Sequence, residues 1–288
     1  MKPKLPSAAR RPRGIRRIAR WIGLYVLVLA AVIFAVLPIY WMLVTAVQRG
    51  TDLYVWPPHL HPNLHEAAVF VRLFETQPIA RWLVNSLAVG CGAAFLSVVL
   101  SVFAAYSLSR FRYRGRGLLS FLLLLTQMLP STVLIVPLFI FFREVNLLNT
   151  RAALILANSA IIAPITVWIL KAFFDTIPTE IEEAGLVDGC SRLGVLRRIT
   201  LPLSAPAVVA AFAIGFFEAW GEFAFALTFV SDQSLWVTSV GLASWIGYLT
   251  TPVEIMMSGA VVFTLPSVLF FLILQRQLVS GLAAGAIR

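Results

Sequence analysis

The sequence predicts an all-α, polytopic membrane protein with six transmembrane helices. Its 288 residues are 60% hydrophobic and only 12% charged. A soluble domain has roughly 45–50% apolar and about 25% charged residues. The apolar residues also stand in long uncharged blocks, and a helix needs about 20 such residues to cross the hydrocarbon core of a bilayer.

Five of these blocks are long enough to be transmembrane helices without any charged residue in their core. We expect spans one, two, three, four and six at about 22–45, 82–109, 118–141, 152–173 and 255–274. Together with a fifth span they form a predicted transmembrane domain over 21–274. The first block exceeds the 7–15 residues of a signal-peptide core, so we expect it to be a retained helix.

The fifth span is expected at about 207–230 and contains two carboxylates, Glu218 and Glu222. Residues four apart share one helix face, and ionisable residues inside a membrane usually face a bundle interior or a water-filled path. With Trp220 and Phe223 nearby, they suit the hydroxyl groups of a sugar. These four residues are therefore candidates for a substrate pathway, and polar pairing with a neighbouring subunit is the alternative.

Five prolines lie within the predicted spans. Each removes a backbone hydrogen bond and tends to kink its helix, which membrane helices tolerate when neighbouring groups satisfy the freed carbonyls. They predict either ordinary helix shaping or hinges. The five are Pro38, Pro130, Pro137, Pro164 and Pro266.

The net charge of +10 follows the predicted topology. Eight basic residues precede the first span, four arginines lie in 110–116, and three lie in the loop before span five. Because basic loops face the cytoplasm, both termini should be cytoplasmic. We expect the basic tail 1–20 to lie near anionic lipid, and we expect no nucleic-acid partner.

The predicted cytoplasmic loop 175–206 has the features of two short helices. Thr179 and Glu182 form a capping-box pattern that predicts a helix start, and Gly189 predicts a left-handed stop. Ser191 is placed to cap a second helix, with Leu201-Pro202 as its end. The small residues Ala184 and Gly185 would let another protein approach closely.

The spacing in this loop resembles a known motif. Glu183-Ala184-Gly185, three residues, Gly189, nine residues, Ile199, one residue and Leu201-Pro202 is similar to the EAA motif of bacterial ABC-importer permeases. Only Gly185 differs, since the motif has Ala there, and a helical Gly costs up to about 1 kcal/mol. Stretches 81–86, 104–111, 127–130 and 136–138 also resemble carbohydrate permeases, and the tail 275–288 looks like the second permease subunit of maltose-type importers.

The resemblance implies the type I fold of ABC-importer permeases and a multi-pass subunit of the bacterial inner membrane. Such a subunit forms half of the pathway for a sugar, polyol or glycerol-phosphate compound. The implied partners are a sister permease subunit, an ABC ATPase homodimer that binds ATP and Mg, an external sugar-binding protein and membrane lipid. We expect no catalytic residue, metal site or cofactor in this chain, since it has no phosphate-binding loop of the G-x-x-x-x-G-K-[ST] kind.

The resemblance also assigns candidate residues. Contact with the ATPase is expected through the coupling loop at Glu183, Ala184, Gly185, Asp188, Gly189, Leu201 and Pro202. A second contact is expected through the C-terminal tail at Ser280, Gly281, Leu282 and Gly285. The outer loop 231–252 resembles a loop that reaches into the binding protein.

One motif departs from the family pattern. The family often has Trp-Asn-Glu-Phe where this chain has Trp220-Gly221-Glu222-Phe223. An alternative function is an ion-coupled secondary transporter or channel that uses Glu218 and Glu222 as relays. That alternative has no need of the spacing found in the loop 175–206.

Overall fold

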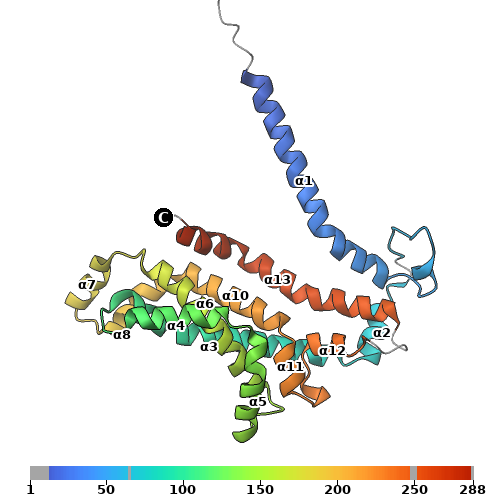
Figure 1. Cartoon of the computed structure of the whole chain (residues 1–288). Coiled ribbons are helices and arrows are strands. Elements are labelled where there is room, and N and C mark those ends of the chain that lie inside the picture. The colour runs from blue at the N-terminus through green and yellow to red at the C-terminus, as the bar shows by residue number, and fades with distance from the viewer. Residues whose placement is uncertain (1–12, 64–65, 247–251, 287–288) are drawn as a thin grey trace, which may run out of the picture.

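The computed structural model describes residues 13–63, 66–246 and 252–286, and every regular element within those ranges is a helix (Figure 1). Four helices are continuous and long enough to cross a membrane. They are α1 (Arg13–Ala46), α3 (Ile79–Arg110), α6 (Arg151–Phe174) and α13 (Val253–Ala286). Spans one, two, four and six of the sequence prediction are therefore single helices.

Two helices extend into the predicted tails 1–20 and 275–288. Residues 1–12 lie outside the described part of the chain, and α1 is already helical at Arg13. At the other end α13 continues to Ala286, so the residues from 275 onward extend the last span as one helix. The side chains of 278–288, including the predicted contacts Ser280, Gly281, Leu282 and Gly285, lie outside the described residues.

The third span is bent at Pro130, one of the five prolines for which a kink was predicted. The segment is a pair of helices, α4 (Arg116–Met128) and α5 (Ile135–Glu144), joined by the 3-10 turn η3 (Ser131–Leu134) and bent by 98°. Leu129 precedes Pro130 and is extended, as a residue before proline tends to be. Pro130 is thus at a break, whereas Pro38, Pro164 and Pro266 lie inside continuous helices.

The fifth span is also broken. The coupling loop leads through α8 (Arg192–Val195), the π-helical turn η4 (Leu196–Thr200) and α9 (Leu201–Leu203) into α10 (Ala205–Gly221), with a bend of 80° between Arg192–Leu203 and Ala205–Gly221. A separate short helix, α11 (Ala224–Phe229), follows Glu222. The described chain thus has four continuous spans, or up to six if each bent pair is one span.

Small residues let the central helices pack closely. A methyl group at Gly215 of α10 would lie 3.0 Å from Ile162 Cγ2 and 3.4 Å from Ala94 Cα. Close helix approach through small side chains is typical of membrane bundles. The contacts of α3 with α6 and of α10 with α3 form the centre of the fold, and their fully buried small residues include Ala93, Ala94, Ala105, Ala153, Ala157, Ala207, Ala210, Ala211 and Ala213.

The bundle has two distinct ends, with α1 pointing away from it (Figure 1). At one end, here called the loop end, lie α7 (Thr179–Val187) and α8. At the far end lie α2 (Val69–Thr76) and α12 (Thr238–Ala243), along with the short turns η1 (Asp52–Tyr54) and η5 (Gln233–Leu235). Residues 20–41 of α1 are exposed along their whole length.

Candidate functional site

The loop end is organised around Arg110, the last residue of α3. Its Nε lies 3.0 Å from Glu182 Oε1 on α7, and both side chains are 8% exposed. A second nitrogen, Nη2, donates to the backbone carbonyls of Phe174 (2.9 Å) and Ile177 (3.0 Å). Carbonyls at a helix C-terminus lack intrahelical donors and favour a cation. Arg110 therefore ties α3, the end of α6 and α7 together.

Glu182 accepts two further hydrogen bonds. Tyr106 of α3 donates its hydroxyl to Glu182 Oε2 at 3.1 Å, and Thr200 of η4 donates to Oε1 at 2.9 Å. A buried charge is costly unless it is paired and hydrogen-bonded, and this carboxylate meets both conditions. We call Tyr106, Arg110, Glu182 and Thr200 the buried junction.

A second, partly buried set of bonds surrounds the junction. Ser109 donates to Asp175 Oδ1 at 2.7 Å, and Lys171 lies 2.6 Å from Asp175 Oδ2. Arg110 Nη1 donates to the Ser109 hydroxyl at 3.2 Å. The chain that leaves α6 is thus fixed to α3 before α7 begins.

Two sequence-based details of this loop were wrong. α7 begins at Thr179 with Pro178 as its N-cap and without a side-chain cap bond, because Glu182 turns inward to the junction. The predicted capping box is therefore absent. Leu201-Pro202 does not end a helix, since the chain stays helical through Leu203 and breaks at Ser204.

Other predicted details of the loop are confirmed. Gly189 has φ +87°, the left-handed region that favours glycine. The Ser191 hydroxyl accepts a hydrogen bond from Gly194 N at 3.1 Å and caps α8. Gly185, which was expected to let another protein approach closely, is instead buried against η4 of the same chain, where an added Cβ would lie 2.5 Å from Ile199 Cδ1.

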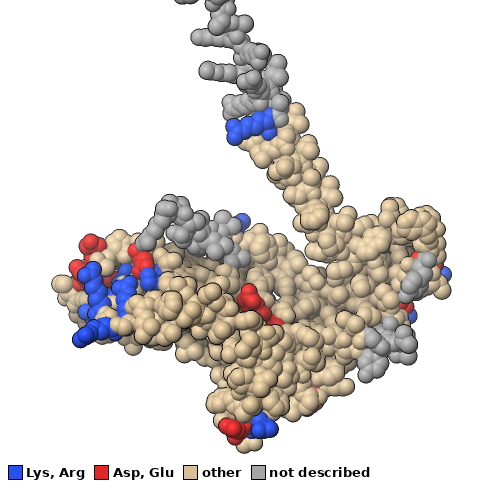
Figure 2. Space-filling model, in the orientation of Figure 1, with Lys and Arg blue, Asp and Glu red and all other residues tan. Residues whose placement is uncertain are grey.

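The outward face of α7 carries the predicted coupling residues. Glu183, Ala184, Asp188 and Gly189 are exposed, as is Pro202, whereas Gly185 is buried and Leu201 is half-buried. Figure 2 shows Lys, Arg, Asp and Glu gathered over the end that carries α7 and α8. A hollow of about 740 Å³ beside them is lined by Asp188, Gly189, Cys190, Ser191, Leu193, Gly194, Arg197 and Arg198.

Two apolar side chains in this charged region were missed from the sequence. Val187 is 87% exposed and Leu193 is 62% exposed. Exposed apolar groups rimmed by polar residues mark contact surfaces. The available signal was the position of Val187 directly before Asp188-Gly189, at the end of the helix.

The candidate substrate residues do not share one helix face. Glu222 lies in the break between α10 and α11, where its backbone is extended. Its carboxylate accepts from Phe225 N (2.7 Å) and Ala226 N (3.1 Å), so it caps the first turn of α11. Glu218 stays on α10 and is exposed. The two carboxylates therefore have different environments.

The aromatic members of this group also separate. Trp220 is buried and stacks on Phe263 of α13, with ring centroids 5.0 Å apart. Its indole Nε1 has no hydrogen-bond partner among the described residues. Phe223 is exposed and lines an apolar hollow between α12 and α13 with Leu242, Trp245 and Met256.

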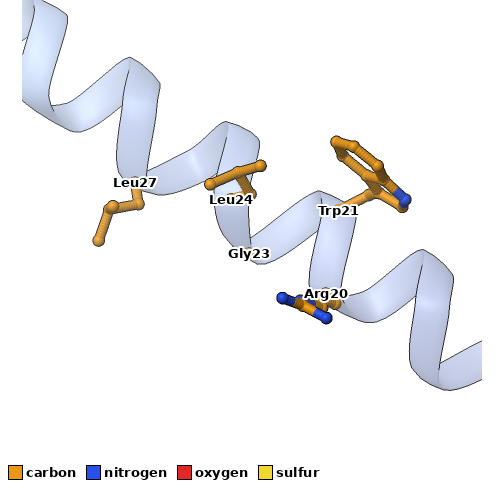
Figure 3. Close-up of a pocket in the computed structure, with 5 residues that line it drawn as sticks. All are labelled: Arg20, Trp21, Gly23, Leu24 and Leu27. Atoms are coloured by element: carbon orange, nitrogen blue, oxygen red, sulfur yellow. The ribbon is translucent and has the colours of Figure 1, made fainter. Parts of the chain in front are cut away.

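A further hollow, of about 670 Å³, lies along α1. Arg20, Trp21, Gly23, Leu24 and Leu27 line it, and all come from that single helix (Figure 3). An added Cβ at Gly23 would have no neighbour within 4 Å. Because one helix supplies these walls, the hollow is a notch in the exposed surface of α1.

Comparisons with known proteins agree with this architecture. The family model described as "Binding-protein-dependent transport system inner membrane component" matches residues 97–283. The sulfoquinovosyl glycerol permease SmoH of Agrobacterium fabrum is 35% identical over 87% of this chain and 88% of its own length. The trehalose/maltose permease MalG of Thermococcus litoralis is 32% identical over 91% and 96%.

Solved structures share the fold. A chain from a bacterial ABC transporter involved in the import of alginate superposes with a TM-score of 0.79 at 19% identity, covering 94% of this chain and 99% of that one. A chain of the methionine transporter MetNI superposes with a TM-score of 0.57 at 17% identity, covering 70% and 95%.

The bundle of long apolar helices with a charged helical loop at one end defines a membrane transport subunit. The chain belongs to the family of binding-protein-dependent transport system inner membrane components and is a permease subunit of an ABC importer. This class does not need Glu222 as an ion relay, and the two hydrogen bonds that Glu222 accepts give it a structural role.

Proposed function

We propose that this chain forms half of the translocation pathway of a sugar importer and couples it to an ATPase through α7 and α8. The relatives' names include permeases for sulfoquinovosyl glycerol, trehalose, maltose and diacetylchitobiose. A sugar, a sugar glycoside or a related polyol is therefore the proposed substrate class. A sister permease supplies the other half, and an external binding protein delivers the sugar.

The buried junction is the observation that carries the coupling role. Glu182 holds the inner face of α7 to Tyr106 and Arg110 of α3. The opposite face, with Glu183 and Val187, is left exposed. A force applied to the exposed face would pass into α3 through two charge-assisted hydrogen bonds instead of bending a free loop.

The occupant of the exposed face is proposed to be the ATPase subunit. ATP and Mg are bound by that partner, because this chain has no phosphate-binding loop. A cytoplasmic location of the loop end is supported by its arginines, which include Arg112, Arg114, Arg192 and Arg197. Both termini then lie on the same side, and the helix beyond residue 275 is a second candidate contact with the ATPase.

Substrate contact is proposed at the α10 break. Trp220 offers a buried indole N–H and Glu218 an exposed carboxylate on the same helix. Aromatic faces and hydrogen-bonding groups suit a sugar ring. Phe223 and Glu222 shape the break, so their effect on the sugar would be indirect.

Reconstitution tests the function. The chain, purified with its partner subunits in lipid, should import sugar only when ATP is present. Substituting a large residue at Gly189, or Arg at Glu183, should release or uncouple the ATPase while the membrane domain stays folded. Sugar uptake driven by an ion gradient through this chain alone would contradict the proposal.

A further inference from the structure

The far end contains a hydrogen-bonded clamp that joins α3 to the segment 231–240. Asn85 of α3 is fully buried, and its Nδ2 donates to the carbonyls of Ser234 (3.0 Å) and Trp236 (2.8 Å). Both hydrogens of one amide group are thus used by a segment about 150 residues away in the chain. The segment between these contacts includes the short turn η5.

The next residue of α3 continues the clamp. The Ser86 hydroxyl accepts from Thr238 N at 2.8 Å and hydrogen-bonds with Thr238 Oγ1 at 3.0 Å. Thr238 begins α12, so Ser86 satisfies an amide that has no partner within its own helix. Trp82, one turn earlier, lies against α12 at Gly241, where an added Cβ would be 2.1 Å from the indole ring.

The other end of the segment is held by Asn149, in the turn between α5 and α6. Its Oδ1 accepts from Ser231 N (2.7 Å), Ser231 Oγ (3.0 Å) and Asp232 N (3.2 Å). Asn149 adopts φ +57°, a left-handed conformation that asparagine tolerates. The segment 231–240 is thus held at its start by Asn149, in its middle by Asn85 and at Thr238 by Ser86.

Three polar side chains at the start of this segment face the solvent. Ser231, Asp232 and Gln233 are exposed. The amide of Ser234 donates to Asp232 and lowers the pKa of that carboxyl group, with a smaller contribution from Arg81. Asp232 therefore presents a negative charge at neutral pH from a segment that hydrogen bonds join to Asn149 and Asn85.

We infer that Asn85, Ser86 and Asn149 are positioning residues that hold the segment 231–240 in the conformation in which it meets the external binding protein. The inference rests on the proposed function. α3 is one continuous helix that carries this clamp at one end and the buried junction at the other. Contact at the far end would therefore act on the same helix that holds α7.

The test uses the complete reconstituted importer and its own binding protein, purified with the sugar that it carries. Variants are Asn85→Asp, which keeps the shape and removes both donors, and Ser86→Ala. The matched control is Ser97→Ala, which removes another buried serine–threonine hydrogen bond of α3, to Thr166 at 3.2 Å. Basal ATPase activity, stimulation by the binding protein, and hydrogen exchange of 231–240 are measured.

We expect both variants to keep basal ATPase activity and to need at least about tenfold more binding protein for half-maximal stimulation, since two lost hydrogen bonds exceed 1.4 kcal/mol. Hydrogen exchange of the segment 231–240 should be faster in both variants than in the wild type. The control Ser97→Ala should match the wild type in hydrogen exchange and in stimulation by the binding protein. Thr238→Ser, which keeps the hydroxyl, should also match it. If the importer with Asn85→Asp fails to assemble, the positioning role is tested by comparing Ser86→Ala with Thr238→Ser.

Three other outcomes are distinct. If the wild type is stimulated and the clamp variants respond equally, the positioning role is wrong and the proposed function stands. If loss of stimulation is always accompanied by equal loss of basal activity, the residues are merely structural and the inference is overturned. If the wild type itself is not stimulated, the proposed function fails together with the inference.

Discussion

Arg110 Nε and Glu182 Oε1 lie 3.0 Å apart, and each side chain is 8% exposed. The two residues are 72 positions apart in the chain. An ion pair this well buried is stable only with further hydrogen bonds, which Tyr106 and Thr200 provide. The orientation of α7, and so of its proposed docking face, therefore depends on residues of α3 and η4.

Glu182→Gln should weaken the loop end strongly, because it leaves the Arg110 charge buried without its counter-ion. Removal of one partner of a buried pair costs about 3–5 kcal/mol, to be measured as the loss in unfolding free energy of the purified importer. Glu66→Gln is the control. It breaks an ion pair with Arg49 in which the side chains are 65% and 24% exposed, and should cost under about 1 kcal/mol. Equal losses of unfolding free energy in Glu182→Gln and Glu66→Gln would contradict the buried ion pair of the junction.

Gly185→Ala should be tolerated. The close contact of the added methyl group is with Ile199 Cδ1, the end of a flexible side chain, while Val195 Cγ2 lies at an ordinary 3.4 Å. Ala also favours the helix by up to about 1 kcal/mol. Gly185→Val places more atoms in the same contact and should reduce ATPase retention. Co-purification of the ATPase with each variant checks this, and equal retention by Val would show that α7 does not pack tightly on η4.

Gly189→Ala should destabilise the turn after α7. The left-handed backbone at φ +87° costs a residue with a Cβ about 1–2 kcal/mol. Gly189→Asn should lose less stability than Gly189→Ala, since asparagine adopts the left-handed conformation more readily. The difference in midpoint temperature between the two variants is the measurement, and Ala performing as well as Asn would contradict the observed backbone.

Gly241→Ala should disturb the far end. The added Cβ would lie 2.1 Å from the Trp82 ring, so the ring must move, at about 1–3 kcal/mol for overpacking. Trp82→Leu in the same chain should recover part of this loss. Gly221→Ala, where an added Cβ has no neighbour within 4 Å, is the control for thermal unfolding. Equal midpoints for Gly241→Ala and Gly221→Ala would be inconsistent with the packing of α12.

Hydrophobicity and charge predicted the membrane class and the rough positions of the spans, because lipid exposure depends on composition over some 20 residues. Pro130 was among the prolines predicted to kink a helix, but composition does not show which of these residues breaks its helix, because each break depends on one or two residues. Leu129-Pro130 ends a helix that composition alone makes continuous. Glu222 ends α10 because its carboxylate is used by the amides of α11.

The exposed half of the proposed coupling site could be predicted from local spacing, because Gly189 and Ser191 each determine the conformation of their own turn. The buried half could not, because Glu182 pairs across the fold. A local rule placed it in a capping box with Thr179, and the tertiary ion pair with Arg110 prevailed. The same applies to Asn85 and Asn149, whose partners are backbone groups of a distant segment.

The most direct test of the account is retention of the ATPase by a Val187→Asp variant. Val187 is 87% exposed on the proposed docking face, and Val71, 59% exposed at the far end, gives the control Val71→Asp. Val187→Asp should lower the affinity for the ATPase at least about tenfold, because a charge opposed to an apolar contact costs over 1.4 kcal/mol. Val71→Asp should leave that affinity unchanged, and both variants should keep the thermal stability of the permease. Equal ATPase retention and equal ATP-driven uptake by both variants would contradict the account.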